Sequence, residues 1–136
     1  MHRLMMIVLM LLVCAVSALA QDEAQAAVGL EITEMAFGVD YDGETRTLVG
    51  ESSTFVAGTS EVYCRTRVVG ADEPTNVTHV WYRDGKTQAH VELTVGSSNW
   101  RTYSSKKLQP DWTGAWEVRV LDSAGNLLRS EHFTVE

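Results

Sequence analysis

From residue 61 onward, apolar and polar residues alternate in short runs that are separated by turn-forming residues. Strict alternation places one side of a run against a core and the other toward solvent, which is the pattern of β-strands. A first run of this kind begins at residue 30, and the later ones cover 61–69, 77–83, 87–95, 100–106 and 116–121, with a last run ending at 135. No stretch has a sustained helical period, so the sequence predicts an all-β protein.

Turn signals join these runs at short intervals. Asp84-Gly85 lies between two alternating runs, which is the strongest short-range signal for a β-hairpin. The segment 38–53 is rich in Gly, Asp, Glu and Thr, and we expect a long loop or a loose hairpin there. Seven or so short strands with regular turns predict an immunoglobulin-like antiparallel β-sandwich, which we assign to one domain over 30–136.

The N-terminus has the features of a secretory signal peptide. A short positive start that includes Arg3 is followed by an apolar run over 4–16 and by the small-residue pattern Ala18-Leu19-Ala20. We expect cleavage after residue 20, a flexible lead-in over 21–29, and a periplasmic or secreted protein. The apolar run is shorter than the roughly 20 residues that cross a bilayer, so we expect no stable membrane insertion.

Charge and cysteine content narrow the set of partners. The formal net charge is −7 at pH 7, and cleavage of the signal removes one more positive residue. This balance argues against nucleic acid and anionic lipid surfaces as partners. Cleavage also leaves Cys64 as the single cysteine, which cannot form an internal disulfide. Its place in the alternation predicts a buried side chain, and a disulfide between chains is the alternative.

The histidines after the signal give little support for catalysis. His79, His90 and His132 fall on three different expected strands, and none has a second His or Cys at ligand spacing. Alternation places His90 and His132 outward, while His79 shares a face with Trp81. We expect no metal, no cofactor and no catalytic residue. An envelope hydrolase or metal-dependent enzyme that uses His79 is the alternative.

A block of aromatic, basic and hydroxyl side chains follows the turn at 96–99 and is richer than a sandwich core requires. An aromatic platform beside a planar guanidinium can stack on sugar rings or on a partner's aromatic side chains. The candidate binding residues are Trp100, Arg101, Tyr103, Ser105, Lys106, the nearby Trp112, and His79. We expect Trp116 in the core, and Trp100 packing inward remains an alternative. The sequence thus favours a non-catalytic binding domain for an envelope protein or glycan, with a structural spacer as a further alternative.

The order of several short motifs resembles a known family. The motifs are Thr78-His79-Val80-Trp81-Tyr82, Trp100-Arg101-Thr102-Tyr103-Ser104-Ser105-Lys106, Thr113-Gly114-Ala115-Trp116 and Phe133-Thr134-Val135. Together they resemble the bacterial envelope family known only as domain of unknown function 2914, over roughly 32–135. The matching positions are His79, Trp81, Trp100, Arg101, Ser104, Ser105, Gly114 and Trp116, while Tyr103 stands where a tryptophan is more usual. The resemblance implies a small extracytoplasmic β-sandwich and no established activity.

Overall fold

A computed structural model describes residues 29–136, so the expected signal peptide and nearly all of the lead-in lie outside the described residues. Ten strands make up the fold: β1 (Glu31–Gly38), β2 (Asp40–Asp42), β3 (Thr47–Val49), β4 (Thr54–Phe55), β5 (Glu61–Val69), β6 (Thr75–Arg83), β7 (Lys86–Val95), β8 (Asn99–Lys107), β9 (Gly114–Asp122) and β10 (Leu127–Val135). In this part of the chain there is no helix long and apolar enough to span a membrane.

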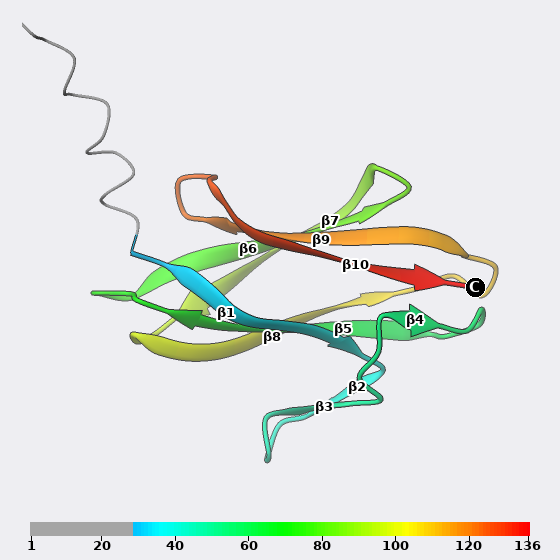
Figure 1. The fold of residues 1–136 in the computed structure, drawn as a ribbon, viewed down its shortest axis with the longest axis horizontal. Coiled ribbons are helices and arrows are strands. Elements are labelled where there is room, and N and C mark those ends of the chain that lie inside the picture. The colour runs from blue at the N-terminus through cyan, green and yellow to red at the C-terminus, as the bar shows by residue number, and fades with distance from the viewer. Residues whose placement is uncertain (1–28) are drawn as a thin grey trace, which may run out of the picture.

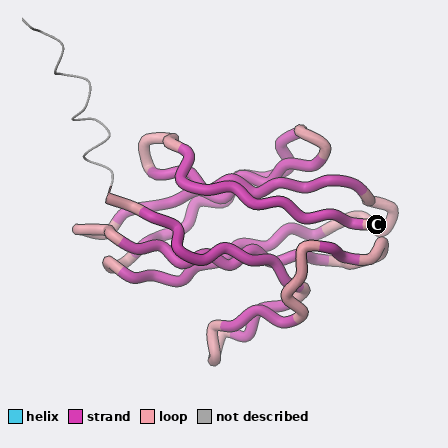
Figure 2. The backbone as a smooth tube through the Cα atoms, in the orientation of Figure 1, coloured by secondary structure: helices cyan, strands magenta, loops and turns pink. Residues whose placement is uncertain are grey.

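The strands form two facing layers with a small hairpin attached. One layer has the strand order β1-β5-β8 and the other has the order β4-β10-β9-β6-β7 (Figure 1). All pairings are antiparallel except that of β4 with β10. The predicted all-β sandwich is confirmed, and its seven long strands are the seven expected runs. Short loops join most of them at the two ends of the sandwich (Figure 2).

The segment 38–53, expected as a loop or loose hairpin, contains β2 and β3. These two strands pair with each other as a separate two-stranded sheet. Figure 1 shows the hairpin projecting below the three-stranded layer, on the side away from the five-stranded layer. This outer position matters for the site described below.

The core follows from the alternation in the sequence. Along β5, Val62, Cys64, Thr66 and Val68 are fully buried, while the residues between them are partly exposed. Trp116 is likewise buried, as expected. The prediction of a buried Cys64 is confirmed, and burial, with the nearby charge of Glu131, raises the pKa of its thiol. Because β5 lies in the middle of its sheet, its inward side chains fix which face of β8 points into the sandwich.

Candidate ligand-binding groove beside strand β8

Strand β8 divides the candidate strip between two faces. Trp100 lies opposite Val68 and Lys106 opposite Val62 in the register with β5, so both belong to the face that points toward the other sheet. Arg101, Tyr103 and Ser105 alternate with them and lie on the outer face. The strip is therefore not one continuous surface.

A groove of about 450 Å³ lies at the start of β8, where residues of both faces meet hairpin β2–β3 and the end of β7. Strand β8 ends its sheet, so one of its edges has no partner strand among residues 29–136. The side chains that give the groove its character are Tyr41, Arg46, Trp100, Arg101, Thr102 and Tyr103. Trp100 is 37% exposed and Tyr103 42% exposed, so both aromatic rings are accessible. The groove is thus open, largely aromatic and basic.

Hairpin β2–β3 forms one wall of the groove. The ring of Tyr41 stacks on the ring of Tyr103, with centroids 4.1 Å apart and an interplanar angle of 25°. The hairpin turn is held by Asp42, whose carboxylate accepts hydrogen bonds from the backbone N–H groups of Glu44 and Thr45 at 2.9 and 3.3 Å. These bonds lower the pKa of Asp42. The wall is therefore tied both to its own turn and to β8.

The indole of Trp100 is positioned by a glycine. A Cβ atom built on Gly96 would lie 2.9 Å from two ring carbons of Trp100, closer than side chains pack. The missing side chain lets the six-membered ring rest against the backbone of the β7–β8 turn. The same turn is fastened to the neighbouring loop by a hydrogen bond from Gly70 N–H to the carbonyl of Ser98, 2.9 Å long. Trp100 is therefore held in place while more than a third of its surface stays open.

The arginines near the groove differ in how they are paired. Arg67 and Arg101 lie directly opposite each other on β5 and β8. Arg67 donates to the side chains of Asn99 at 2.8 Å and Glu34 at 3.4 Å. Among residues 29–136, neither Arg101 nor Arg46 has a carboxylate oxygen within 4.0 Å. The groove thus holds two guanidinium groups without a protein counter-charge.

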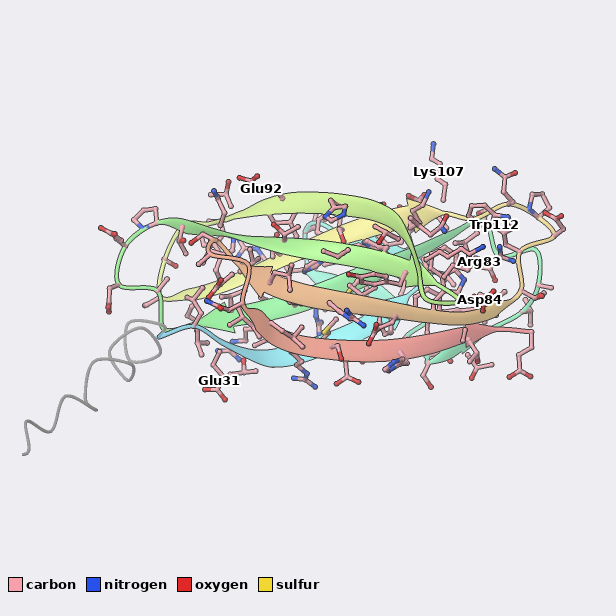
Figure 3. The ribbon with its side chains drawn as sticks, turned by 90° about the horizontal axis from the view of Figure 1, so that it is seen from above. Glu31, Arg83, Asp84, Glu92, Lys107 and Trp112 are labelled. Carbon is pink, nitrogen blue, oxygen red and sulfur yellow. The ribbon has the colours of Figure 1, made fainter. Side chains whose placement is uncertain are left out.

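Three other candidate residues lie away from the groove. Lys106 Nζ and the Arg83 guanidinium lie 5.9 and 5.0 Å from the ring centroid of Trp112, whose other neighbour is the core residue Trp116. Figure 3 shows Trp112 beside Arg83 at the end of the sandwich where Lys107 lies. Ser105 donates to the Glu61 carboxylate at 2.8 Å on the outer face. The structure thus brings Trp100, Arg101 and Tyr103 together but places Ser105, Lys106 and Trp112 elsewhere.

His79, the remaining candidate, is fully buried between the two sheets and is not a lining residue of the groove. Its Nδ1 lies 2.6 Å from Ser104 Oγ and its Nε2 lies 3.1 Å from Thr66 Oγ1. Burial lowers its pKa to about 4, so the imidazole is neutral at pH 7. No three His, Cys, Asp or Glu residues between 29 and 136 are grouped to hold a metal ion. His90 and His132 are exposed, as alternation predicted.

Sequence reasoning missed three residues that shape the groove. Tyr41 and Arg46 flank the turn that Asp42-Gly43 signalled, but nothing local in the sequence says that this hairpin reaches β8. Arg46 also has a left-handed backbone conformation, with φ of 58°, which is uncommon for a residue with a side chain. Gly96 was expected in a turn, but its contact with the Trp100 ring depends on the conformation of that turn, which the sequence does not specify.

Comparison with known protein families adds one match. The model of the family described as "Protein of unknown function (DUF2914)" matches residues 74–135. The match covers somewhat less than half of the chain and shows that this segment is similar to the DUF2914 family. The matched segment contains β6 to β10 and so supplies Trp100, Arg101 and Tyr103. Tyr41 and Arg46 precede it, and the match is shorter than the 32–135 that the resemblance suggested.

Other comparisons give little beyond the DUF2914 match. No curated protein matches the chain. A crystal structure of a β-glucosidase from Kluyveromyces marxianus is similar at 10% sequence identity with a TM-score of 0.45, covering 79% of this chain. The matched part makes up 14% of the glucosidase, so the chain spans only a small share of that protein's length. A similarity this weak does not indicate a shared activity.

Proposed function

We propose that this protein is a secreted, periplasmic, non-catalytic binding domain that holds a component of the bacterial envelope in the groove beside β8. The observation that carries the proposal is the pair of unpaired guanidinium groups, Arg46 and Arg101, next to the accessible indole of Trp100. Both arginines are exposed to solvent and line the groove together with its aromatic side chains, and ligand sites gather a few polar groups among aromatic walls in this way. A spacer domain has no need of this arrangement.

The surroundings of the polar side chains support binding rather than catalysis. Acyl transfer requires a nucleophile beside a base and an open position for the substrate. The hydroxyl of Ser104 does lie beside His79, but Ser104 is 4% exposed and His79 is fully buried. A substrate therefore has no route to this pair in the folded sandwich. In the groove itself, Thr102 is a hydroxyl with no histidine among the lining residues.

The proposed location follows from the N-terminal sequence. The positive start, the apolar run and Ala18-Leu19-Ala20 are the features that direct a chain to the secretory pathway. The family resemblance also suggests an envelope protein. We propose an envelope glycan or protein as the partner, and no nucleic acid, because the chain carries a net charge of −7.

Capture from a native envelope extract tests the proposal. The mature protein is immobilised and compared with Trp100→Ala/Arg101→Ala, which removes an aromatic ring and a cation from the groove. The matched control is Trp112→Ala/Lys106→Ala, which removes an aromatic ring and a cation that lie near each other outside the groove. We expect the groove variant to lose a specific envelope component that the wild type and the control retain, with all three folded by circular dichroism. Equal recovery by all three proteins would refute the groove as the binding site.

A further inference from the structure

We infer that the groove binds an acidic sugar residue of a polysaccharide, with the ring against Trp100 and the carboxylate at Arg101 and Arg46. This inference rests on the proposed function and narrows it to a class of ligand. Three properties of the groove carry it: uncompensated positive charge, a positioned aromatic face, and limited length.

The charge of the groove selects an anion. The chain as a whole is acidic, yet the groove contains two arginines and no carboxylate among its lining residues. Arg101 also lies opposite Arg67, and like charges at directly opposed positions of two strands destabilise a sheet. Glu34 supplies a counter-charge to Arg67 and Asn99 accepts a hydrogen bond from it, but neither residue does so for Arg101. A ligand carboxylate supplies the missing counter-charge, and the planar guanidinium binds carboxylates through two parallel hydrogen bonds.

The aromatic face favours a flat, partly apolar ligand. One face of Tyr103 is covered by Tyr41, so the stacked pair serves as a wall and not as the open platform. Trp100 is the accessible ring, and its six-membered ring already packs against the turn at Gly96. A pre-positioned ring loses little conformational entropy on binding. A pyranose ring presents a face of C–H groups that fits this surface, while its substituents reach the polar groups around it.

The extent of the groove distinguishes a sugar from an added peptide strand. A peptide that extends a sheet pairs along the backbone of an edge strand, and its affinity grows with the paired length. The groove contacts only Asn99 to Tyr103 of the nine residues of β8. Its volume of about 450 Å³ falls within the usual range for small-ligand pockets. A short site with a ring platform and two cations fits one or two sugar residues better than an extended chain.

Binding of defined oligosaccharides tests the inference. Mature protein is titrated calorimetrically with short oligomers of galacturonic, glucuronic and mannuronic acid, each paired with its methyl ester, which keeps the sugar but removes the charge. We expect at least one acidic oligomer to bind. Its ester should bind with an affinity lower by a factor of about ten or more, as the loss of a charge-assisted contact implies. Affinity should also fall as salt is added.

Variants locate the site. Arg101→Gln and Arg46→Gln should each weaken binding of the acidic oligomer about tenfold, and Trp100→Ala should weaken the acid and its ester alike. Gly96→Ala keeps every contacting side chain but displaces the indole, so it should lower affinity as well. Lys107→Gln removes an exposed cation at the other end of β8 and should change nothing.

The outcomes separate this inference from the proposed function. If no acidic oligomer binds while envelope capture still depends on the groove, the site is real and the ligand class is wrong. Equal binding of acid and ester, or preferential binding of an oligo-glutamate peptide, overturns the acidic-sugar assignment. If envelope capture is also independent of the groove, the proposed function fails with it.

Discussion

The indole nitrogen of Trp81, on β6, donates a hydrogen bond to the hydroxyl of Ser104, on β8, across a distance of 3.0 Å. These strands belong to different sheets, so the bond crosses the middle of the sandwich. The same hydroxyl lies 2.6 Å from Nδ1 of His79. One serine therefore bonds two buried polar side chains of the opposite sheet, and an apolar residue at this position would leave the Trp81 N–H and the Nδ1 of His79 without a partner.

Ser104→Ala is expected to lower the free energy of unfolding by about 1–3 kcal/mol, because it leaves the Trp81 N–H and the His79 nitrogen buried without their partner. Urea denaturation followed by tryptophan fluorescence measures the change. Ser105→Ala is the matched control, since Ser105 bonds Glu61 on the outer face and its loss should cost less than about 1 kcal/mol. Equal effects of the two variants would contradict the role assigned to Ser104.

The folded protein should lose stability as pH falls from about 6.5 toward about 4. Burial lowers the pKa of His79 from 6.5 to about 4 in the folded state, so between these values only the unfolded chain takes up the proton. Proton uptake by the unfolded state favours unfolding, and the loss approaches about 3 kcal/mol at the lower limit. The groups bonded to His79, Thr66 and Ser104, are neutral and give no compensating charge.

Urea denaturation at a series of pH values measures this slope. His79→Gln removes the titrating group while keeping a polar side chain, so its unfolding free energy should vary much less over the same range. A slope that persists unchanged in His79→Gln would assign the effect to other groups.

Removal of the charge should lower the stability of the protein at Arg67 but not at Arg101. Arg67→Gln loses the contact with Glu34 and should destabilise the protein by about 0.5 kcal/mol. Arg101→Gln relieves the repulsion between the two guanidinium groups and should leave stability unchanged or raise it by a few tenths of a kcal/mol, roughly. Thermal unfolding at low and high salt checks both values. A clear loss of stability in Arg101→Gln would show that Arg101 has a structural partner.

Alanine substitutions at Gly70 and Gly58 distinguish the cost of backbone strain from that of steric conflict. Both have a φ of 92°, so alanine is strained at either position by roughly 1–2 kcal/mol. At Gly58 nothing lies within 4 Å of an added Cβ, whereas at Gly70 the carbonyl oxygen of Gly29 lies 2.0 Å away. Gly70→Ala should therefore cost clearly more stability than Gly58→Ala in chemical denaturation. Similar costs would indicate that Gly29 moves aside without a large penalty.

The strands and the core were predictable because they depend on local alternation. Val62, Cys64 and Val68 are buried at every second position of β5, and Trp116 faces inward in the same way. Asp84-Gly85 correctly marked the hairpin between β6 and β7. These features need no knowledge of which strands become neighbours.

The composition of the candidate site was less predictable. The alternation of β8 places Trp100 and Arg101 on opposite faces, yet both line the groove at the start of the strand. Ser105 and Lys106, which follow them closely in the sequence, lie outside the groove, so sequence proximity alone did not define the site. The placement of Tyr41 against Tyr103 depends on a contact between segments about 60 residues apart, which no local pattern records. The pairing of Ser104 with His79 likewise required the register of the two sheets.

Because hairpin β2–β3 forms one side of the groove, the lining residues come from two separate parts of the chain. Trp100, Arg101 and Tyr103 come from the part of the chain that matches DUF2914, while Tyr41 and Arg46 come from the part before it. A protein with a similar segment and a different preceding hairpin would keep Trp100, Arg101 and Tyr103 but lose the Arg46 cation and the ring of Tyr41 that stacks on Tyr103. Ligand preference can thus diverge between relatives by exchange of a short surface hairpin, without any change to the sandwich that carries it.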